Sequence, residues 1–373
     1  MAKLANADGQ GQGLIFINTT SNSSQSNVSG SDAIAIGSNT TVTGIDTMAI
    51  GRNSIATQDQ SIVIGRDARN SQSLSPNCVV IGNQAGLTNS PNNDSVLVGY
   101  NTSGNGASLV LIGSGATSGN GSNNAVVIGQ GSTILGAGGY NVVVGTGISN
   151  ASPSVIALGA GVTATTKGAI AIGRIASVST GLTGIAIGYI ATTTGASAIA
   201  IAGDVTTGIS TTASGDNSVA IGKFAKATRA GQFAYSSDFF AAQEDAQIWM
   251  MILRNTTTTA TVTEILAGGL AASYLTLADN HVYSLDVQIV GRRTDVVGDT
   301  AVFSLVFAVK RETGVATVAL LGTPTKTVIQ RTDATWDVNA AADTTNGRVA
   351  INVTGAAAKT IHWMANARVT EVA

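Results

Sequence analysis

The stretch Ala169–Gly173 is Ala-Ile-Ala-Ile-Gly, and variants of it recur along the first 222 residues. Each copy places an apolar residue two positions before an Ile, Val or Leu that is followed by glycine, and successive glycines lie 14 to 19 residues apart. The glycines of the regular copies are Gly37, Gly51, Gly65, Gly82, Gly99, Gly113, Gly129, Gly145, Gly159, Gly173, Gly188 and Gly222. A degenerate copy ends at Gly203, because Ala202 precedes that glycine. A motif that returns at such a period indicates a repeat architecture.

Each copy of the motif predicts a short β-strand. In a strand Ile170 and Ile172 fall on one face and Ala169 and Ala171 on the other, since successive side chains alternate. Both faces are apolar, so we expect both to be buried. The glycine that follows supplies a positive φ for a turn. A unit this short cannot hold a strand and a helix, and it fits one coil of a parallel β-solenoid.

The alanine face of these strands predicts the oligomeric state. A single thin coil with two apolar faces would leave one of them in water. Small side chains allow another backbone to approach closely, so we expect the alanine stripe, including Ala171 and Ala186, to face symmetry mates. Only 12 charged residues lie between Gly30 and Gly222, whereas 26 follow Gly222. Such a surface predicts a tightly associated homo-oligomer.

The repeats resemble those of a known family of proteins. The stretches Ala169–Gly173, Gly184–Gly188 and Ser218–Gly222 are similar to the repeat of YadA-type head domains. Those domains are left-handed parallel β-rolls of trimeric autotransporter adhesins, and similar rolls occur in bacteriophage fibres. Over residues 31–222 the resemblance therefore implies a left-handed, homotrimeric β-roll.

The second half of the chain has a different composition. All three tryptophans and both histidines lie beyond Gly222, and Lys223–Ala230 is a basic segment. From about Ala246 onward, apolar and polar residues alternate, as in Tyr283–Ile289 and Val349–Val353. Alternation between turns predicts an antiparallel β-sandwich or jelly roll. We therefore expect an all-β protein with an N-terminal attachment segment at 1–30, the roll at 31–222, a neck at 223–240 and a C-terminal tip domain at 241–373.

The C-terminal region is also similar to the ends of phage tail fibres, on the passages Gly231–Gln247, Ile289–Thr294 and Lys359–Trp363. The resemblance implies a virion fibre, made in the host cytoplasm, that ends in a receptor-binding tip. Its partners would be itself, other virion proteins at the N-terminus, and a host surface polysaccharide or outer-membrane receptor. Neither a secretory signal nor a membrane anchor is recognisable, which favours the fibre over the alternative of a bacterial cell-surface trimeric adhesin.

Composition argues against several other classes of function. The chain has two His and one Cys, too few for a metal cluster and few for a Cys–His nucleophile. We therefore expect no cofactor and no metal. A formal net charge of −2 gives no electrostatic case for nucleic acid, and no apolar run is long enough for membrane insertion. A glycosidase needs two carboxylates across a cleft, but the acids of the roll are scattered singly, so we expect a non-enzymatic protein. The threonines are too irregular for an ice-binding array.

Turns of the tip domain carry the candidate receptor contacts, because binding residues usually sit on loops. These are Arg292, Arg293, Asp295, Asp333 and Asp337. Arginines beside aspartates can bind an anionic sugar or a phosphate, and a hairpin with exposed charges is the competing interpretation.

Other residues have structural interpretations. We interpret Asp238, Glu244 and Asp245 as solvated acids, and Cys78 as a small buried residue at a strand start. His281 and His362 are expected at the surface or an interface. The tryptophans Trp249, Trp336 and Trp363 are expected in the core of the tip domain.

Overall fold

The computed structural model describes residues 15–17, 26–88, 92–135, 139–203, 208–268 and 273–373, so most of the predicted attachment segment at 1–30 lies outside it. The chain divides into two compact units, residues 1–183 and 184–373. The described residues form β-strands and one short 3-10 helix, η1 (Val315–Thr317). Among them no helix has the length and apolarity to cross a membrane. The predicted all-β class is confirmed.

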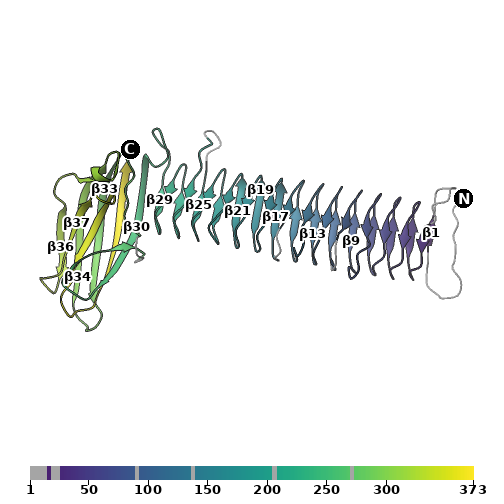
Figure 1. Cartoon of the computed structure of the whole chain (residues 1–373), viewed down its shortest axis with the longest axis horizontal. Helices are drawn as coiled ribbons and strands as arrows, with labels where there is room; N and C mark the ends of the chain where they lie inside the picture. The colour runs from purple at the N-terminus through teal and green to yellow at the C-terminus, as the bar shows by residue number, and fades with distance from the viewer. Residues whose placement is uncertain (1–14, 18–25, 89–91, 136–138, 204–207, 269–272) are drawn as a thin grey trace. The chain divides into compact units, whose positions relative to one another are not determined.

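The first unit is a parallel β-solenoid, in which each coil contributes one strand to each of two sheets (Figure 1). The first sheet contains β1 (Ile15–Ile17), β3 (Ile34–Ile36), β5 (Met48–Ile50), β7 (Ile62–Ile64), β9 (Val79–Ile81), β11 (Val96–Val98), β13 (Val110–Ile112), β15 (Val126–Ile128), β17 (Val142–Thr146), β19 (Ile156–Ala160) and β21 (Ile170–Arg174). The second sheet contains β2 (Asn27–Val28), β4 (Thr41–Val42), β6 (Ile55–Ala56), β8 (Arg69–Asn70), β10 (Gly86–Leu87), β12 (Ser103–Gly104), β14 (Thr117–Ser118), β16 (Thr133–Ile134), β18 (Ser149–Asn150), β20 (Thr163–Ala164) and β22 (Ser177–Val178). Equivalent motif positions stack, as Ile156 on Ile170 and Ala157 on Ala171.

The orientation of the strands differs from the prediction. Ala171 is fully buried inside its own coil, and the flanking Ile170 and Ile172 are only half-buried on the outside. The expectation that the alanine stripe faces symmetry mates is therefore wrong. The inward position of the first sheet is alanine in some coils and Val or Leu in others, and it is fully buried in each case. Where Leu97 occupies it, the opposite wall has Gly104, whose added Cβ would lie 3.2 Å from the leucine side chain.

The outward stripe is consequently the apolar one. Its more exposed members in the first unit are Ile62, Ile112, Ile128, Val142 and Ile156, each more than a third exposed. Bulky β-branched side chains therefore lie along one outer side of the coils. Ile and Val are usually buried in protein interiors, so their exposure here is unusual.

The motif glycines act as predicted at the end of each strand. All twelve of the regular copies have positive φ, from 100° at Gly222 to 149° at Gly145. Coil stacking adds a second constraint, because a Cβ on Gly145 would lie 1.6 Å from the carbonyl oxygen of Gly159 in the next coil.

The second unit begins with further coils. Their strands are β23 (Ile185–Ile187), β24 (Thr192–Thr193), β25 (Ile199–Ile201), β26 (Thr212–Ala213), β27 (Val219–Ile221), β28 (Lys226–Ala227) and β29 (Phe233–Tyr235). Residues predicted as the neck thus contribute one more coil, since β28 pairs in parallel with β26 and β29 with β27. On its other edge β29 pairs antiparallel with β30 (Ala246–Thr257).

The C-terminal domain contains two antiparallel sheets. The larger has the order β30, β39 (Ile361–Val372), β33 (His281–Arg293), β34 (Thr300–Arg311) and β36 (Thr325–Arg331), with β32 (Leu266–Ala267) beside β30 and β35 (Ala319–Leu320) beside β34. The smaller consists of β31 (Val262–Glu264), β38 (Arg348–Thr354) and β37 (Asp337–Asp343).

The predicted apolar stripes of this domain line the core between the two sheets. Leu285 of β33 and Ile351 of β38 are at most 1% exposed. Trp336, just before β37, packs edge-on against Trp363 of β39 with 5.5 Å between ring centroids. The predicted core placement of the tryptophans is confirmed, because Trp249 is also only 2% exposed. The fold is a parallel solenoid followed by antiparallel sheets.

Candidate functional site

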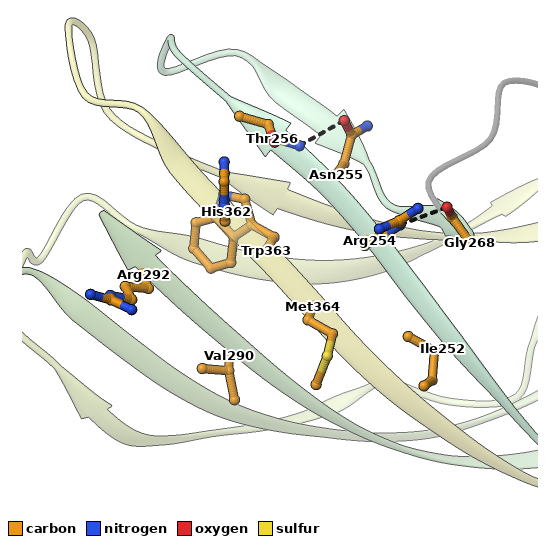
Figure 2. A pocket seen from close by; sticks show the side chains of 10 residues that line it. All are labelled: Ile252, Arg254, Asn255, Thr256, Gly268, Val290, Arg292, His362, Trp363 and Met364. Carbon is orange, nitrogen blue, oxygen red and sulfur yellow. Dashed lines mark hydrogen bonds between the residues drawn. The ribbon is translucent and has the colours of Figure 1, made fainter. Parts of the chain in front are cut away.

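The larger sheet of the C-terminal domain carries a groove of about 820 Å³ on the face opposite the core (Figure 2). Its floor is apolar, formed by Ile252 of β30, Val290 of β33 and Met364 of β39. Since side chains alternate along a strand, these residues point outward where Leu253, Ile289 and Trp363 point inward.

The remaining polar lining of the groove is cationic or neutral. Arg254, Arg292 and His362 lie around the floor, each on a different strand, and no acidic side chain is among the lining residues (Figure 2). Arg254 donates from Nε to the carbonyl oxygen of Gly268 at 2.6 Å. Within the described residues, the side chains of Arg292 and His362 form no hydrogen bond or ion pair. The groove can therefore accept an anionic group at its polar end and apolar groups on its floor.

A second hollow of about 340 Å³ lies on the same face. Phe233 and Tyr235 of β29 and Ile248 and Met250 of β30 supply its apolar lining. Its charged lining residues neutralise each other, because Arg368 Nη2 donates to Asp286 Oδ2 at 2.5 Å.

Three of the predicted contact residues are brought together in one ion-pair network on the turns. Arg293 forms two hydrogen bonds of 2.9 Å with the Asp295 carboxylate and a longer one of 3.3 Å with Asp299. Lys359 joins Asp299, at 2.9 Å, to Asp333, at 2.7 Å. The network thus ties together the turns that contain residues 294–299, 332–336 and 355–360.

The network holds its carboxylates in the charged form. The hydrogen bond from Arg293 lowers the pKa of Asp295 to about 2. Hydrogen bonding from Lys359 lowers the pKa of Asp333 and of Asp299. Lys359 was missed by sequence reasoning, since it lies 60 residues from Asp299 and carries no local signal of the pairing.

The other two predicted contact residues lie outside this network. Asp337 receives two hydrogen bonds from Lys326 Nζ, at 2.7 and 2.8 Å. Arg292 lines the groove on the sheet face instead of joining its neighbour Arg293 in the turn. The five residues therefore belong to three separate places on the domain.

A buried polar cluster connects both ends of the domain's sequence. The Glu371 carboxylate accepts hydrogen bonds from Trp249 Nε1 at 2.7 Å and Gln247 Nε2 at 2.9 Å, and His281 Nε2 lies 3.8 Å from it. The His281 ring stacks on Tyr283, and burial raises the pKa of the Tyr283 hydroxyl.

Two of the acids expected to be solvated are buried. Asp245 is 3% exposed and accepts hydrogen bonds from the backbone N–H groups of Phe240, Ala241 and Ala242. Burial raises its pKa, but these amides outweigh that effect, so the pKa is lowered. Glu244, 9% exposed, pairs with Lys226 Nζ at 2.7 Å. The solvated interpretation is wrong for both, because each stabilises the segment that links the coils to the sheets.

His362 and Cys78 lie as expected, but the expected surface position is wrong for His281, whose side chain is 12% exposed and packs against Glu371 and Tyr283. His362 is exposed on the groove side, and Cys78 is fully buried directly before β9. Burial raises the pKa of the Cys78 thiol to about 11. In the part of the chain that the structure describes, no group of three or more His, Cys, Asp and Glu side chains could hold a metal ion.

The solved structures with some likeness to the chain include phage tailspikes. The chain is similar to tailspike gp49 of Acinetobacter baumannii bacteriophage Fri1, a capsular polysaccharide depolymerase, at 9% identity and a TM-score of 0.25, covering 92% of this chain and 65% of that one. The tailspike of Acinetobacter baumannii phage AM24 is 9% identical, with a TM-score of 0.21 and coverage of 92% and 67%. That of Acinetobacter phage vB_ApiP_P1 is 8% identical, with a TM-score of 0.23 and coverage of 96% and 81%. No curated protein matches.

This comparison contradicts the expectation that the chain is not an enzyme, because the first of these tailspikes is a depolymerase. The expectation rested on acids that are scattered in the sequence. Catalytic carboxylates need to be close only in the folded protein, so their separation along the chain does not exclude glycoside cleavage. The likeness assigns that chemistry to no residue of this chain.

The repeats match a described family directly. The YadA head domain repeat matches in two copies, over residues 24–40, 43–68, 179–201 and 207–230. The described residues among them fall in solenoid coils of both units. These segments of the solenoid therefore match the YadA head domain repeat.

Proposed function

We propose that the protein is a homotrimeric attachment fibre of a phage virion, with the solenoid as assembly and spacer region and the C-terminal domain as the part that binds the host-cell receptor. The observation that carries the proposal is the outward Ile/Val stripe of the coils. An apolar patch that extends over many residues of a soluble protein marks an interaction surface. Three chains that pack these stripes together would remove them from water along the whole solenoid.

The C-terminal domain has the features of a recognition element. Its turns are linked by the Arg293–Asp295–Asp299–Lys359–Asp333 network, so they form a stiff support for binding residues. Arg292 and His362 lie near them without partners in the described residues. A guanidinium group that is free to form paired hydrogen bonds suits a carboxylate or phosphate on a host polysaccharide or outer-membrane receptor.

Binding of the purified full chain to host cells tests this proposal. We expect Arg292→Gln to weaken binding several-fold while the variant stays trimeric. Arg52→Gln, which removes an exposed arginine from a solenoid coil, is the matched control and should bind as the wild type does. Equal binding by all three proteins would overturn the assignment of recognition to the C-terminal domain.

The YadA head repeats also support a second candidate, a bacterial cell-surface trimeric adhesin. Immunogold labelling distinguishes the two, because a fibre is labelled on purified virions and an adhesin on the bacterial surface. We expect label on virions, where residues 1–30 would attach the fibre to other virion proteins.

A further inference from the structure

Strand β30 is apolar on both of its faces. On the core side Trp249, Met251 and Leu253 are at most 2% exposed. On the other side Ile248 and Ile252 are more than half exposed. An antiparallel strand with one face in water normally alternates apolar with polar residues, so the second face of β30 is built for burial.

The apolar surface continues across neighbouring strands of the same sheet. Met364 of β39 and Val290 of β33 are 49% and 42% exposed and share the groove floor with Ile252. We call this surface the outer sheet face. It consists of Tyr235, Ile248, Met250, Ile252, Val290 and Met364.

The outer sheet face is continuous with the stripe of the last coils. Strand register places Ile221 of β27 beside Tyr235 of β29, and Tyr235 beside Ile248 of β30. Two residues earlier in β29, Phe233 lies beside Met250 of β30. The same side of the chain that presents Val and Ile in the coils thus presents aromatic residues, Ile and Met where the parallel sheet passes into the antiparallel one.

We propose that the outer sheet face is covered by a second copy of this chain, so that the C-terminal domains contact one another as the coils do. This inference rests on the proposed homotrimer and adds to it a specific surface. The occupant follows from the continuous strand register. A second chain that covers the outward stripe of β27 and β29 would extend directly onto the outer face of β30.

The charges of the outer sheet face fit the same occupant. Arg368 and Asp286 pair with each other within one chain, so the part of the outer sheet face around Tyr235, Ile248 and Met250 has no field of one sign that would select an oppositely charged partner. In a trimer equivalent residues of the three chains approach one another around the threefold axis, and that approach is favourable where the surface is apolar or internally neutralised. The unpartnered Arg292 and His362 lie toward the ends of their strands, where an apolar interface has its polar rim.

Oxidative footprinting of the assembled full chain tests the inference through its methionines. Met250 and Met364 lie on the outer sheet face and are about half exposed in a single chain, whereas the adjacent Met251 is 1% exposed. If a second copy covers the face, hydroxyl radicals should oxidise Met250 and Met364 several-fold more slowly than the freely exposed Phe240 and Tyr140, at rates near that of Met251. A trimer in which Met250 and Met364 react rapidly would overturn the inference and leave the homotrimer intact. A monomer would overturn both.

A matched pair of variants gives an independent readout. Ile252 on the outer sheet face and Ile329 in the edge strand β36 are 56% and 57% exposed. Ile252→Glu should lower the melting temperature of the C-terminal domain and make Met250 and Met364 reactive, because it places three carboxylates in a dry contact. Ile329→Glu should change neither. Equal effects of the two substitutions would contradict the proposed contact.

Discussion

A side chain on Gly145 would meet the carbonyl oxygen of Gly159 at 1.6 Å, so the stacking of two coils depends on the absence of a single carbon atom. Both glycines have positive φ, at 149° and 135°. The column of motif glycines is therefore constrained twice, by the backbone conformation of each coil and by the distance to the next.

Replacing Gly145 with alanine should destabilise the solenoid by about 3 kcal/mol or more, since neither the conformation nor the space admits a Cβ. Gly147→Ala is the control. Gly147 also has positive φ, 62°, but nothing lies within 4 Å of an added Cβ, so its cost should be about 1 kcal/mol. Denaturant unfolding of both variants measures the difference, and similar midpoints would contradict the stacking constraint.

A larger side chain at an inward position should destabilise the coil that contains it. Ala171→Leu adds volume to a fully buried position and should cost about 1 to 3 kcal/mol through overpacking. Ile170→Leu, on the half-buried outward position, should cost less than about 1.5 kcal/mol. If Ala171→Leu gave a stable, folded monomer, the alanine would lie at an interface between chains after all.

The hydrogen bond between Trp363 Nε1 and Thr257 Oγ1, 2.9 Å long, is buried between the sheets of the C-terminal domain. Thr257→Val keeps the shape but leaves the indole N–H without an acceptor, and it should destabilise the domain by about 1 to 3 kcal/mol. Thr256→Val, at the adjacent exposed position, should have little effect. Thermal unfolding followed by tryptophan fluorescence compares the two variants.

The turn network makes the C-terminal domain sensitive to acid. The folded pKa values of Asp295, Asp299 and Asp333 lie below their unfolded values, so their contribution to stability is full above about pH 4 and is lost as the pH falls toward 2. Lys359→Gln should lower the melting temperature at pH 6 and have a smaller effect near pH 2, because the stability that the lowered pKa values contribute is progressively lost once the pH falls below the unfolded pKa values of these carboxylates. A difference in melting temperature that is independent of pH would show that Lys359 acts by packing alone.

The sequence predicts a strand's inward face only where its two faces differ in polarity. Leu285 and Asp286 alternate in β33, and the apolar residue is the buried one. In the solenoid Ile170 and Ala171 are both apolar, and the narrow interior of the coil, a property of the folded cross-section, decides that alanine lies inside. The outer sheet face could not be predicted for the same reason, because Ile248 and Trp249 are both apolar and their pattern does not show which of them is exposed.

For the candidate site, the sequence predicts the charged residues of the turns but not the ion pairs that form between distant turns. Arg293 and Asp295 are near in sequence, and their pairing follows from one hairpin. Lys359 reaches Asp333 only because β39 lies beside β33, whose hairpin brings β34 and β36 to the same end of the sheet. The groove has no sequence signal of its own, since Arg254, Arg292 and His362 come from three strands.

Sedimentation equilibrium of the full chain at micromolar concentration tests the central claim most directly. The account predicts one species with three times the 37.2 kDa mass of the chain, because the outward Ile/Val stripe of every coil needs a partner. A stable, folded monomer with that stripe in water would contradict it.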